Sequence, residues 1–314
     1  MFLICNNETT DPTVNLALEE HCFRNLDPAF DYLLFYINRP SVIIGRHQNP
    51  FQEFHQDLVR RKGILPVRRI SGGGAVYHDT GNLNFSFITS FSDEKLDYFK
   101  RLLAPILNTL QQLGMPAQLT EKNNILVNGR KISGNSQHTN MRRMLSHGTL
   151  LFDSDLELLQ RVLKTDLKIK KSRAVSSIPG KVTNIAGYLG RPMDMVSFRA
   201  AVQKGISRVF GEMTEYRLTP EDREAVDRLA NIKYKSWDWT FGRTPEFTVR
   251  HRLGIESGHM DACFNVKNGV IRNVEPEDNL PQTSSTRRMM AGFIGKRYDP
   301  RYVMDVCLSD KRVT

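Results

Sequence analysis

Short apolar runs separated by polar turns predict a helix and two strands at the start of the chain. Asp11 followed by Pro12 is a favourable helix start, and the apolar spacing after it predicts a helix over 12–25. The apolar runs at 32–37 and 41–45 predict two adjacent buried strands joined by an Asn-Arg-Pro turn. The opening segment therefore predicts a helix beside a buried sheet.

The same patterning predicts helices and strands in the rest of the chain. Apolar runs predict strands over 64–70 and 143–152, and a polar–apolar alternation predicts another over 83–90. Asn-Gly pairs at 128–129 and 268–269 predict two-residue hairpin turns. Helical spacing predicts helices at residues 50–62, 94–113, 156–163, 195–210, 220–232 and 284–293.

The order of these elements predicts an α+β protein with two domains. Residues 1–230 are expected to form a large domain around a mixed sheet. The pattern changes after Lys235, where antiparallel strands followed by a helix predict a small α/β domain over 235–314. A chain of 314 residues is long enough for this arrangement.

The charge balance favours an anionic partner. There are 44 Lys and Arg against 34 Asp and Glu, which gives a formal net charge of +10. The basic residues are dispersed and no aromatic ladder accompanies them, so no nucleic-acid partner is predicted. A nucleotide or an acidic protein fits this distribution better.

The lengths of the apolar runs and the cysteine pattern bear on the cellular location of the protein. No run approaches the roughly 20 apolar residues of a membrane span, and the apolar start is too short for a signal peptide. Cys5, Cys22, Cys263 and Cys307 show no metal-ligand spacing and no disulfide framework. We therefore expect a cytoplasmic protein with no membrane partner.

Three consecutive glycines, Gly72–Gly74, are the first candidate for a ligand site. Neither common phosphate motif fits, because no Gly-Lys-Ser/Thr follows and Tyr77 stands where a dinucleotide fingerprint needs glycine. Bare glycines allow a ligand to take hydrogen bonds from main-chain N–H groups, and Arg68, Arg69 and His78 add charge nearby. The alternative is a tight bend packed against another backbone.

A second cluster follows the first Asn-Gly turn. Lys131 and Ser133 lie on the returning strand, and His147, Gly148 and Thr149 lie on the apolar strand after it. A lysine held on a rigid strand can stabilise a phosphate or a developing carbonyl charge. A surface lysine and a half-buried structural histidine are the alternatives at these two places.

Four segments together resemble the lipoate–protein ligase family. They are the stretches 45–50, 68–87, 129–137 and 146–156. The resemblance runs from about Asn7 to 237–247, and more loosely to the end. It implies a biotin/lipoate ligase fold, with the adenylate-forming and transferase chemistry in 1–230 and an accessory domain in 235–314. Octanoyltransferases and biotin ligases are weaker relatives of this pattern.

The resemblance implies a reaction in two steps. Lipoate attacks the α-phosphate of ATP to give lipoyl-adenylate, with Mg²⁺ at the phosphates, and a lysine of an acceptor protein then displaces AMP. The implied acceptors are the lipoyl domains of 2-oxoacid dehydrogenase E2 subunits and the glycine-cleavage H protein. An acidic acceptor would be steered by the net positive charge.

The resemblance also assigns residues. Lys131 is the implied catalytic residue, and it contacts both nucleotide and lipoate. The implied ATP or adenylate contacts are Arg69, Gly74, Ala75, Val76 and Tyr77. The implied lipoate or adenylate pocket comprises Ser71, Gly72, Gly73, His78, Asn82, Ser133, His147, Gly148 and Thr149.

Two departures from the family pattern fall on the ATP-using step. The family usually has Asn-Asp at the position of Asn123-Asn124, and its aspartate lies by the metal-bound phosphates, so Asn124 is the implied metal residue here. Residues 177–184 replace a more basic family segment. Loss of a carboxylate weakens Mg²⁺ binding and loss of arginines weakens phosphate contacts, whereas Lys131 is retained.

Three alternatives to an ATP-dependent ligase remain. One is a transferase that uses preformed lipoyl-adenylate and does not activate lipoate. A cysteine-dependent acyltransferase is disfavoured, because no cysteine lies between Cys22 and Cys263. A non-catalytic ligand- or nucleic-acid-binding module would use the positive charge only for binding.

Overall fold

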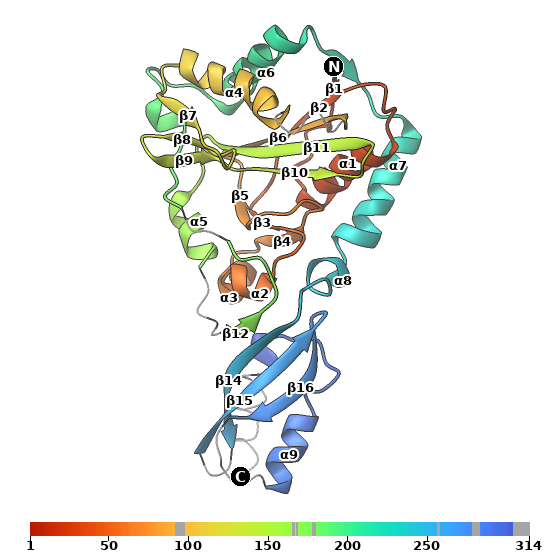
Figure 1. Cartoon of the computed structure of the whole chain (residues 1–314), viewed down its shortest axis with the longest axis vertical. Coiled ribbons are helices and arrows are strands. Elements are labelled where there is room, and N and C mark those ends of the chain that lie inside the picture. Colours follow the sequence, from red (N-terminus) through yellow and green to blue (C-terminus); the bar gives the residue numbers. More distant parts are fainter. Residues whose placement is uncertain are drawn as a thin grey trace.

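The computed structural model describes residues 1–91, 98–164, 167, 169–177, 180–255, 258–277 and 283–303. In Figure 1, helices α4 and α6 lie at the top, a long sheet lies beneath them, and a separate C-terminal sheet forms the lower end. The described chain combines helices with mixed sheets, which confirms the expected α+β class. None of the described helices is long and apolar enough to cross a membrane.

The largest sheet has six strands in the order β10-β11-β6-β2-β1-β13. Strand β1 runs parallel to β2 and β13, and the other pairs are antiparallel, so the sheet is mixed. The strands are β1 (Phe2–Ile4), β2 (Tyr32–Ile37), β6 (Asn82–Ser90), β10 (Asn135–Thr139), β11 (Arg143–Leu151) and β13 (Thr214–Tyr216).

Helices cover both faces of this sheet. Successive side chains of a strand point to opposite faces, so the continuous apolar run in β2 requires cover on both sides. Leu33 and Phe35 pack against α4 and α6, whereas Leu34 and Tyr36 pack on the side of α1 and α7. These helices are α1 (Pro12–Asn25), α4 (Tyr98–Gln112), α6 (Met195–Phe210) and α7 (Pro220–Leu229), which continues into the π-helical turn η3 (Ala230–Tyr234).

The start of α1 agrees with its sequence signals. The Asp11 side chain accepts a hydrogen bond from the Thr13 N–H at 2.8 Å, and Pro12 occupies the first turn. The helix ends at Asn25, as expected. The expected helix over 94–113 is described only as α4, because residues 92–97 lie outside the described ranges.

Two three-stranded sheets lie beside the large one. Their orders are β4-β3-β5 and β7-β8-β9. The strands are β3 (Ser41–Ile44), β4 (Leu65–Arg68), β5 (Val76–His78), β7 (Ala117–Leu119), β8 (Ile125–Val127) and β9 (Arg130–Ser133). The nearby short helices are α2 (Pro50–Glu53), α3 (Gln56–Arg61) and α5 (Leu156–Val162), with the 3₁₀ turn η2 (Ala186–Tyr188).

Three expectations for residues 32–90 were wrong in detail. Strands β2 and β3 do not pair, because β1 and β6 occupy both edges of β2 and β3 joins another sheet. The expected helix over 50–62 is two helices, because Phe54 is extended and buried and His55 caps the second. A further strand, β5, lies between the glycine loop and β6.

Both Asn-Gly pairs form the predicted hairpins. Asn128 and Gly129 have φ of 49° and 73°, and Asn268 and Gly269 have φ of 54° and 69°. Positive φ at both turn positions matches the twist of the flanking strands, which is why Asn-Gly is favoured here. The first turn joins β8 to β9 and so determines where Lys131 lies.

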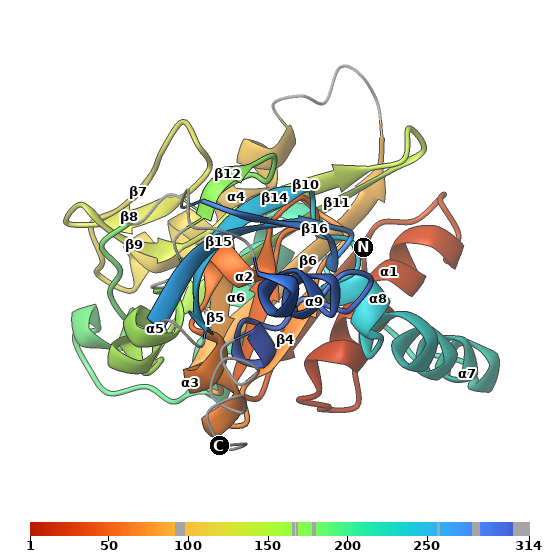
Figure 2. The same cartoon turned by 90° about the horizontal axis from the view of Figure 1, so that it is seen from below.

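The C-terminal sheet contains a strand from the earlier part of the chain. Its order is β12-β14-β15-β16, and β12 (Ile169–Ser172) pairs antiparallel with β14. The other elements are α8 (Trp237–Thr240), β14 (Phe247–Ile255), β15 (Gly258–Lys267), β16 (Val270–Pro276) and α9 (Ser284–Ala291). Seen from below, this sheet lies across the middle of the view, in front of the larger sheet (Figure 2). The division into 1–230 and 235–314 stays a prediction, and it places β12 apart from its sheet.

Candidate active site

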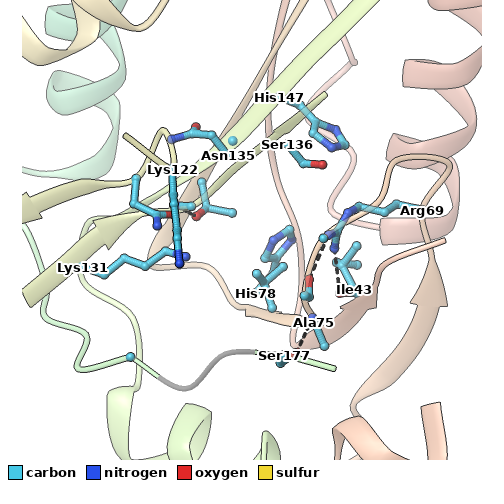
Figure 3. A pocket seen from close by; sticks show the side chains of 18 of the residues that line it. Ile43, Arg69, Ala75, His78, Lys122, Lys131, Asn135, Ser136, His147 and Ser177 are labelled. Atoms are coloured by element: carbon cyan, nitrogen blue, oxygen red, sulfur yellow. Dashed lines mark hydrogen bonds between the residues drawn. The ribbon is translucent and has the colours of Figure 1, made fainter. Parts of the chain in front are cut away.

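A cavity of about 450 Å³ lies where the glycine loop faces the β8–β9 hairpin. Its wall includes Leu16, Tyr36 and Ile43 at one part and lysines at another. Figure 3 shows Ile43, Arg69 and His147 on one side and Lys122 and Lys131 on the other. The cavity therefore joins a buried, partly apolar region to a region with cationic side chains.

The glycine loop is wrapped around the Arg69 guanidinium. Arg69 donates hydrogen bonds to the carbonyl oxygens of Gly72 (2.6 Å), Gly74 (2.8 Å) and Ile43 (3.2 Å). Gly73 has φ of 87°, and a Cβ there would lie 3.0 Å from Arg69 Nη2. A Cβ on Gly45 would lie 2.0 Å from the Gly73 oxygen. The loop therefore needs glycine both for backbone conformation and for close packing.

A buried chain of hydrogen bonds extends from Arg69 behind this loop. Arg69 Nε donates to Ser71 Oγ (2.9 Å), and Ser71 Oγ lies 2.6 Å from His147 Nε2. His147 Nδ1 lies 2.8 Å from Glu19 Oε1, which also accepts from Ser86 at 2.5 Å. Since the carboxylate only accepts, the network assigns the His147 proton to Nδ1. Every member is thereby held in one orientation.

Arg68 does not line the cavity. It is fully buried and donates to the carbonyl oxygens of Gly45 (2.9 Å), Gln48 (2.8 Å) and Thr240 (2.6 Å). Burial, with the neighbouring charge of Arg69, lowers the pKa of Arg68 to about 10. Arg68 thus joins the base of the glycine loop to α8 and supplies no ligand contact.

His78 presents an unpaired ring nitrogen in this region. Its Nδ1 lies 3.0 Å from Asn38 Nδ2, and Asn38 Oδ1 accepts from Asn15. The Asn38 amide therefore donates to Nδ1, which leaves the proton on His78 Nε2. This buried Nε2 has no partner among the described residues. Burial, Arg69 and His147 lower the pKa of His78 to about 3, so the ring is neutral at physiological pH.

Lys131 extends into the cavity from β9. Its backbone N–H donates to the Lys181 oxygen (2.8 Å), and its oxygen accepts from the Thr183 N–H (3.1 Å). Gly134 leaves room for its side chain, because a Cβ there would lie 2.8 Å from Lys131 Nζ. Within the described part of the chain, Nζ makes no hydrogen bond or ion pair. Burial and the charge of Arg69 lower the pKa of Lys131, which shows the cost of holding this cation here.

The structure brings most of the expected residues to the cavity wall. Those that line it are Arg69, Gly73, Gly74, Ala75, Val76, His78, Asn124, Lys131, His147, Gly148 and Thr149.

Five others lie behind the wall. Ser71 holds Arg69 and His147. Asn82 donates to Asn84, and Ser133 contacts Asn135, two residues that do line the cavity. Gly72 lines a second cavity, and Tyr77 is buried in an apolar cluster.

Several wall residues were missed from the sequence. Lys122, Asn135 and Ser136 line the cavity, as do residues 175–177. Ser177 Oγ accepts from the Ala75 N–H (2.9 Å) and from Gln48 Nε2 (3.0 Å), so this segment is tied to the glycine loop. Glu19 was also missed, and the available sign was a carboxylate on an otherwise buried face of a predicted helix.

The cavity offers little to a metal ion. No Asp or Glu belongs to its described wall, and no described cluster of three or more His, Cys, Asp or Glu could hold a metal. Asn124 supplies only a neutral amide. Lys181 lines the cavity, whereas Lys170 pairs with Glu277 in the C-terminal sheet. Pro179 of the departing segment lies outside the described residues.

The chain is similar to known ligases over most of its length. Lipoate-protein ligase LplJ of Bacillus subtilis is 39% identical over 308 residues, which cover 98% of this chain and 93% of that protein. A crystal structure of lipoate-protein ligase A bound with ATP has a TM-score of 0.68 and 28% identity, covering 77% of this chain and 98% of that one.

A second solved structure comes from an archaeal lipoylation system. It is described as that of a bipartite lipoate protein ligase and its E2 lipoyl domain from Thermoplasma acidophilum, and it has a TM-score of 0.67 and 27% identity. The match covers 77% of this chain and 96% of that one. These similarities confirm the ligase fold expected from the sequence.

The family described as the lipoyl protein ligase A/B catalytic domain matches residues 11–207. This range contains the glycine loop, Lys131 and the His147 network, and it covers more than half of the chain. The chain therefore belongs to the lipoate–protein ligase family.

Proposed function

We propose that this protein activates lipoate with ATP and transfers the lipoyl group to a lysine of an acceptor domain. The observation that carries the proposal is one cavity in which a buried wall of Leu16, Tyr36 and Ile43 meets the cations Arg69 and Lys131. A fatty-acid-like substrate needs the first kind of wall, and a nucleotide phosphate needs the second.

In the first step, a carboxylate oxygen of lipoate attacks the α-phosphorus of ATP. The new C(O)–O–P bond forms as the bond to the pyrophosphate oxygen breaks, and pyrophosphate leaves. Lys131 lies where its ammonium would stabilise charge on the α-phosphate, and the glycine loop would donate its main-chain N–H groups to the nucleotide. The role of the protein here is positioning and charge stabilisation.

In the second step, the neutral amine of the acceptor lysine attacks the acyl carbonyl carbon. The amide bond forms as the C–O bond to AMP breaks, and the amine nitrogen loses a proton. Lys131 would then stabilise the negative oxygen of the tetrahedral intermediate and the departing AMP. The fixed Ser71–His147–Glu19 network would keep the acyl end of the cavity in one shape.

A thiol-dependent mechanism has no support in this cavity. Cys22 is buried within α1, and burial raises its thiol pKa, which disfavours the reactive thiolate. Neither Cys5 nor Cys263 belongs to the described wall, and Cys307 lies outside the described residues. A transferase that uses only preformed lipoyl-adenylate is the second candidate, and the lack of any Asp or Glu on the described cavity wall is the observation that favours it.

The proposed acceptors are lipoyl domains of 2-oxoacid dehydrogenase E2 subunits and the glycine-cleavage H protein. The archaeal ligase of similar fold, whose description names an E2 lipoyl domain of the same lipoylation system, supports the first class. Mg²⁺ is proposed to accompany ATP, carried by the phosphates because the described cavity wall has no carboxylate. We also propose that the reaction takes place in the cytoplasm.

Mass spectrometry of an apo lipoyl domain tests the proposal. After incubation with the protein, ATP, Mg²⁺ and lipoate, we expect a mass gain of one lipoyl group on the acceptor. Omission of ATP should prevent the gain. A gain from synthetic lipoyl-adenylate but not from lipoate and ATP would favour the transferase, and no gain from either substrate would contradict both.

A further inference from the structure

We infer that Lys122, together with Lys181, binds the β- and γ-phosphates of ATP and the departing pyrophosphate in place of a carboxylate-bound metal. This inference rests on the proposed function and adds a residue to it. Lys122 is not part of the glycine motif or of the Lys131 segment.

The turn that carries Lys122 is held firmly against the cavity. Thr120 N–H donates to the Asn124 oxygen (2.9 Å), and Asn124 N–H donates to Thr120 Oγ1 (3.1 Å). Asn135 Nδ2 donates to the Asn123 oxygen at 2.6 Å and so ties the turn to β10. Lys122 is exposed, yet its backbone is fixed at the edge of the cavity. A fixed base and a free ammonium suit the binding of a mobile phosphate tail.

Three lysines from separate segments line the same cavity. Lys122 lies between β7 and β8, Lys131 lies on β9, and Lys181 follows the segment that joins β12 to the catalytic region. Figure 3 shows the Lys122 and Lys131 side chains on the same side of the cavity. Within the described ranges, none of these side chains makes a hydrogen bond or an ion pair. Each ammonium is therefore available to a ligand.

The charge of this group requires an anion. With no Asp or Glu on the described wall, the three ammonium groups and Arg69 repel one another across the cavity. A polyphosphate would remove this repulsion and accept several charge-assisted hydrogen bonds at once. The side chain at Asn124 is neutral, and Glu121, which precedes Lys122, is not among the described residues of the cavity wall.

The phosphates that these lysines bind must be the outer ones. Lys131 lies deeper, between Gly134 and the main chain of 181–183, and is proposed to act at the reacting α-phosphate. Lys122 and Lys181 also line the cavity, and both are exposed. A chain of phosphates that starts at Lys131 and extends outward would pass between them. Both lysines then act before and during pyrophosphate release, and neither is needed once the adenylate exists.

Kinetics of the full-length Lys122→Ala protein test this inference. We expect the KM for ATP and the inhibition constant of pyrophosphate each to rise about 10-fold, as for the loss of one charge-assisted contact. Transfer from synthetic lipoyl-adenylate should stay within about twofold of the wild-type rate. Lys122→Arg should restore most of the affinity, because it keeps the charge.

Lys62→Ala provides the matched control, because Lys62 is an exposed lysine at the end of α3 and does not line the cavity. It should leave all three measurements unchanged. An unchanged KM for ATP in an active Lys122→Ala protein would overturn the inference. A slower transfer from the adenylate, with a raised KM for the acceptor, would instead assign Lys122 to acceptor docking. Failure of the wild-type protein to form adenylate would contradict the activation step itself.

Discussion

The buried end and the open end of the cavity differ in how their polar side chains are held. At the buried end, Arg69, Ser71, His147 and Glu19 are joined in one chain of hydrogen bonds, and each polar group is oriented by its neighbour. At the open end, Lys122 and its neighbouring lysines have no partner within the described chain. The first end is arranged before any ligand arrives, whereas the second is completed by the ligand.

The buried end therefore determines the shape of the acyl region, and the open end supplies the positive charge that binds the nucleotide. A satisfied buried network costs little at the moment of binding and holds the acyl region in one geometry. Free ammonium groups repel one another until an anion arrives, so their contribution appears only in the complex. Changes at the buried end should therefore affect stability and fit, and changes at the open end should affect nucleotide kinetics.

Removing the cation between the two ends should have the largest effect. In Lys131→Ala, the charge at the reacting phosphate is lost, and we expect lipoylation to fall about 100-fold or more. Because Lys131 has no described side-chain partner, the free energy of unfolding should change little. Mass spectrometry of the acceptor and a thermal melt measure the two quantities. Near-normal lipoylation by the folded variant would remove Lys131 from the mechanism.

Gly73→Val should disrupt the loop that separates the two ends. Gly73 has φ of 87°, and a side chain there would press on Arg69 Nη2, so we expect affinity for lipoyl-adenylate to fall at least about 10-fold. Calorimetry with a non-hydrolysable adenylate analogue measures this. Gly63→Val is the control, because Gly63 also has positive φ (64°) but has open space around it. Equal binding by both variants would leave the glycines with a structural role only.

Acid should destabilise the buried end through His78. Its pKa is about 3 in the folded protein and near 6.5 in the unfolded chain, so the unfolded state gains a proton as pH falls below 6.5. The contribution to stability is complete above that pH and is lost progressively down to about pH 3.

Urea unfolding of wild type and His78→Gln at several pH values measures this contribution. The difference in unfolding free energy should shrink by about 1 kcal/mol per pH unit between pH 6 and 4. His251 in the C-terminal sheet, whose pKa burial lowers to about 4, is present in both proteins and cancels. A difference that is constant across this range would show that His78 is not held neutral.

Asn124→Asp should have the smallest effect. If the lysines neutralise the outer phosphates, a new carboxylate at the open end adds little, and adenylate formation should change less than about threefold. Transfer from synthetic lipoyl-adenylate should be unchanged. If the rate of adenylate formation rises well beyond threefold while transfer stays constant, the missing carboxylate limits the first step. The transferase that uses preformed lipoyl-adenylate would then be the preferred function.

Local signals in the sequence predicted the elements that depend on local chemistry. The Asp11 cap, the two Asn-Gly hairpins and the strand that carries Lys131 all formed as expected. The motif residues also largely meet at one cavity. These features follow from short-range rules, in which a residue and its neighbours determine the backbone conformation.

Features that depend on distant partners were not predicted. Nothing in the apolar run of β3 shows that β2 already has both edges occupied. The short, charged strand β12 has no clear alternation, and its pairing with β14 depends on residues far along the chain. Lys122 resembles any exposed lysine until the turn that carries it is seen beside the cavity. Pairing and side-chain convergence are three-dimensional properties, and one sequence leaves them open.

Strand β12 has a consequence for how the protein is made. The segment that follows it is fixed at one end by the hydrogen bond from Arg173 N–H to the Glu246 oxygen (3.1 Å), and at the other by Ser177 against Ala75. This segment, which forms part of the cavity wall, thus connects the C-terminal sheet to the glycine loop. During synthesis on the ribosome, β12 emerges long before β14. The pairing of β12 with β14 can therefore form only after the C-terminal sheet has been translated, whereas residues 175–177 can already contact His47 and the glycine loop.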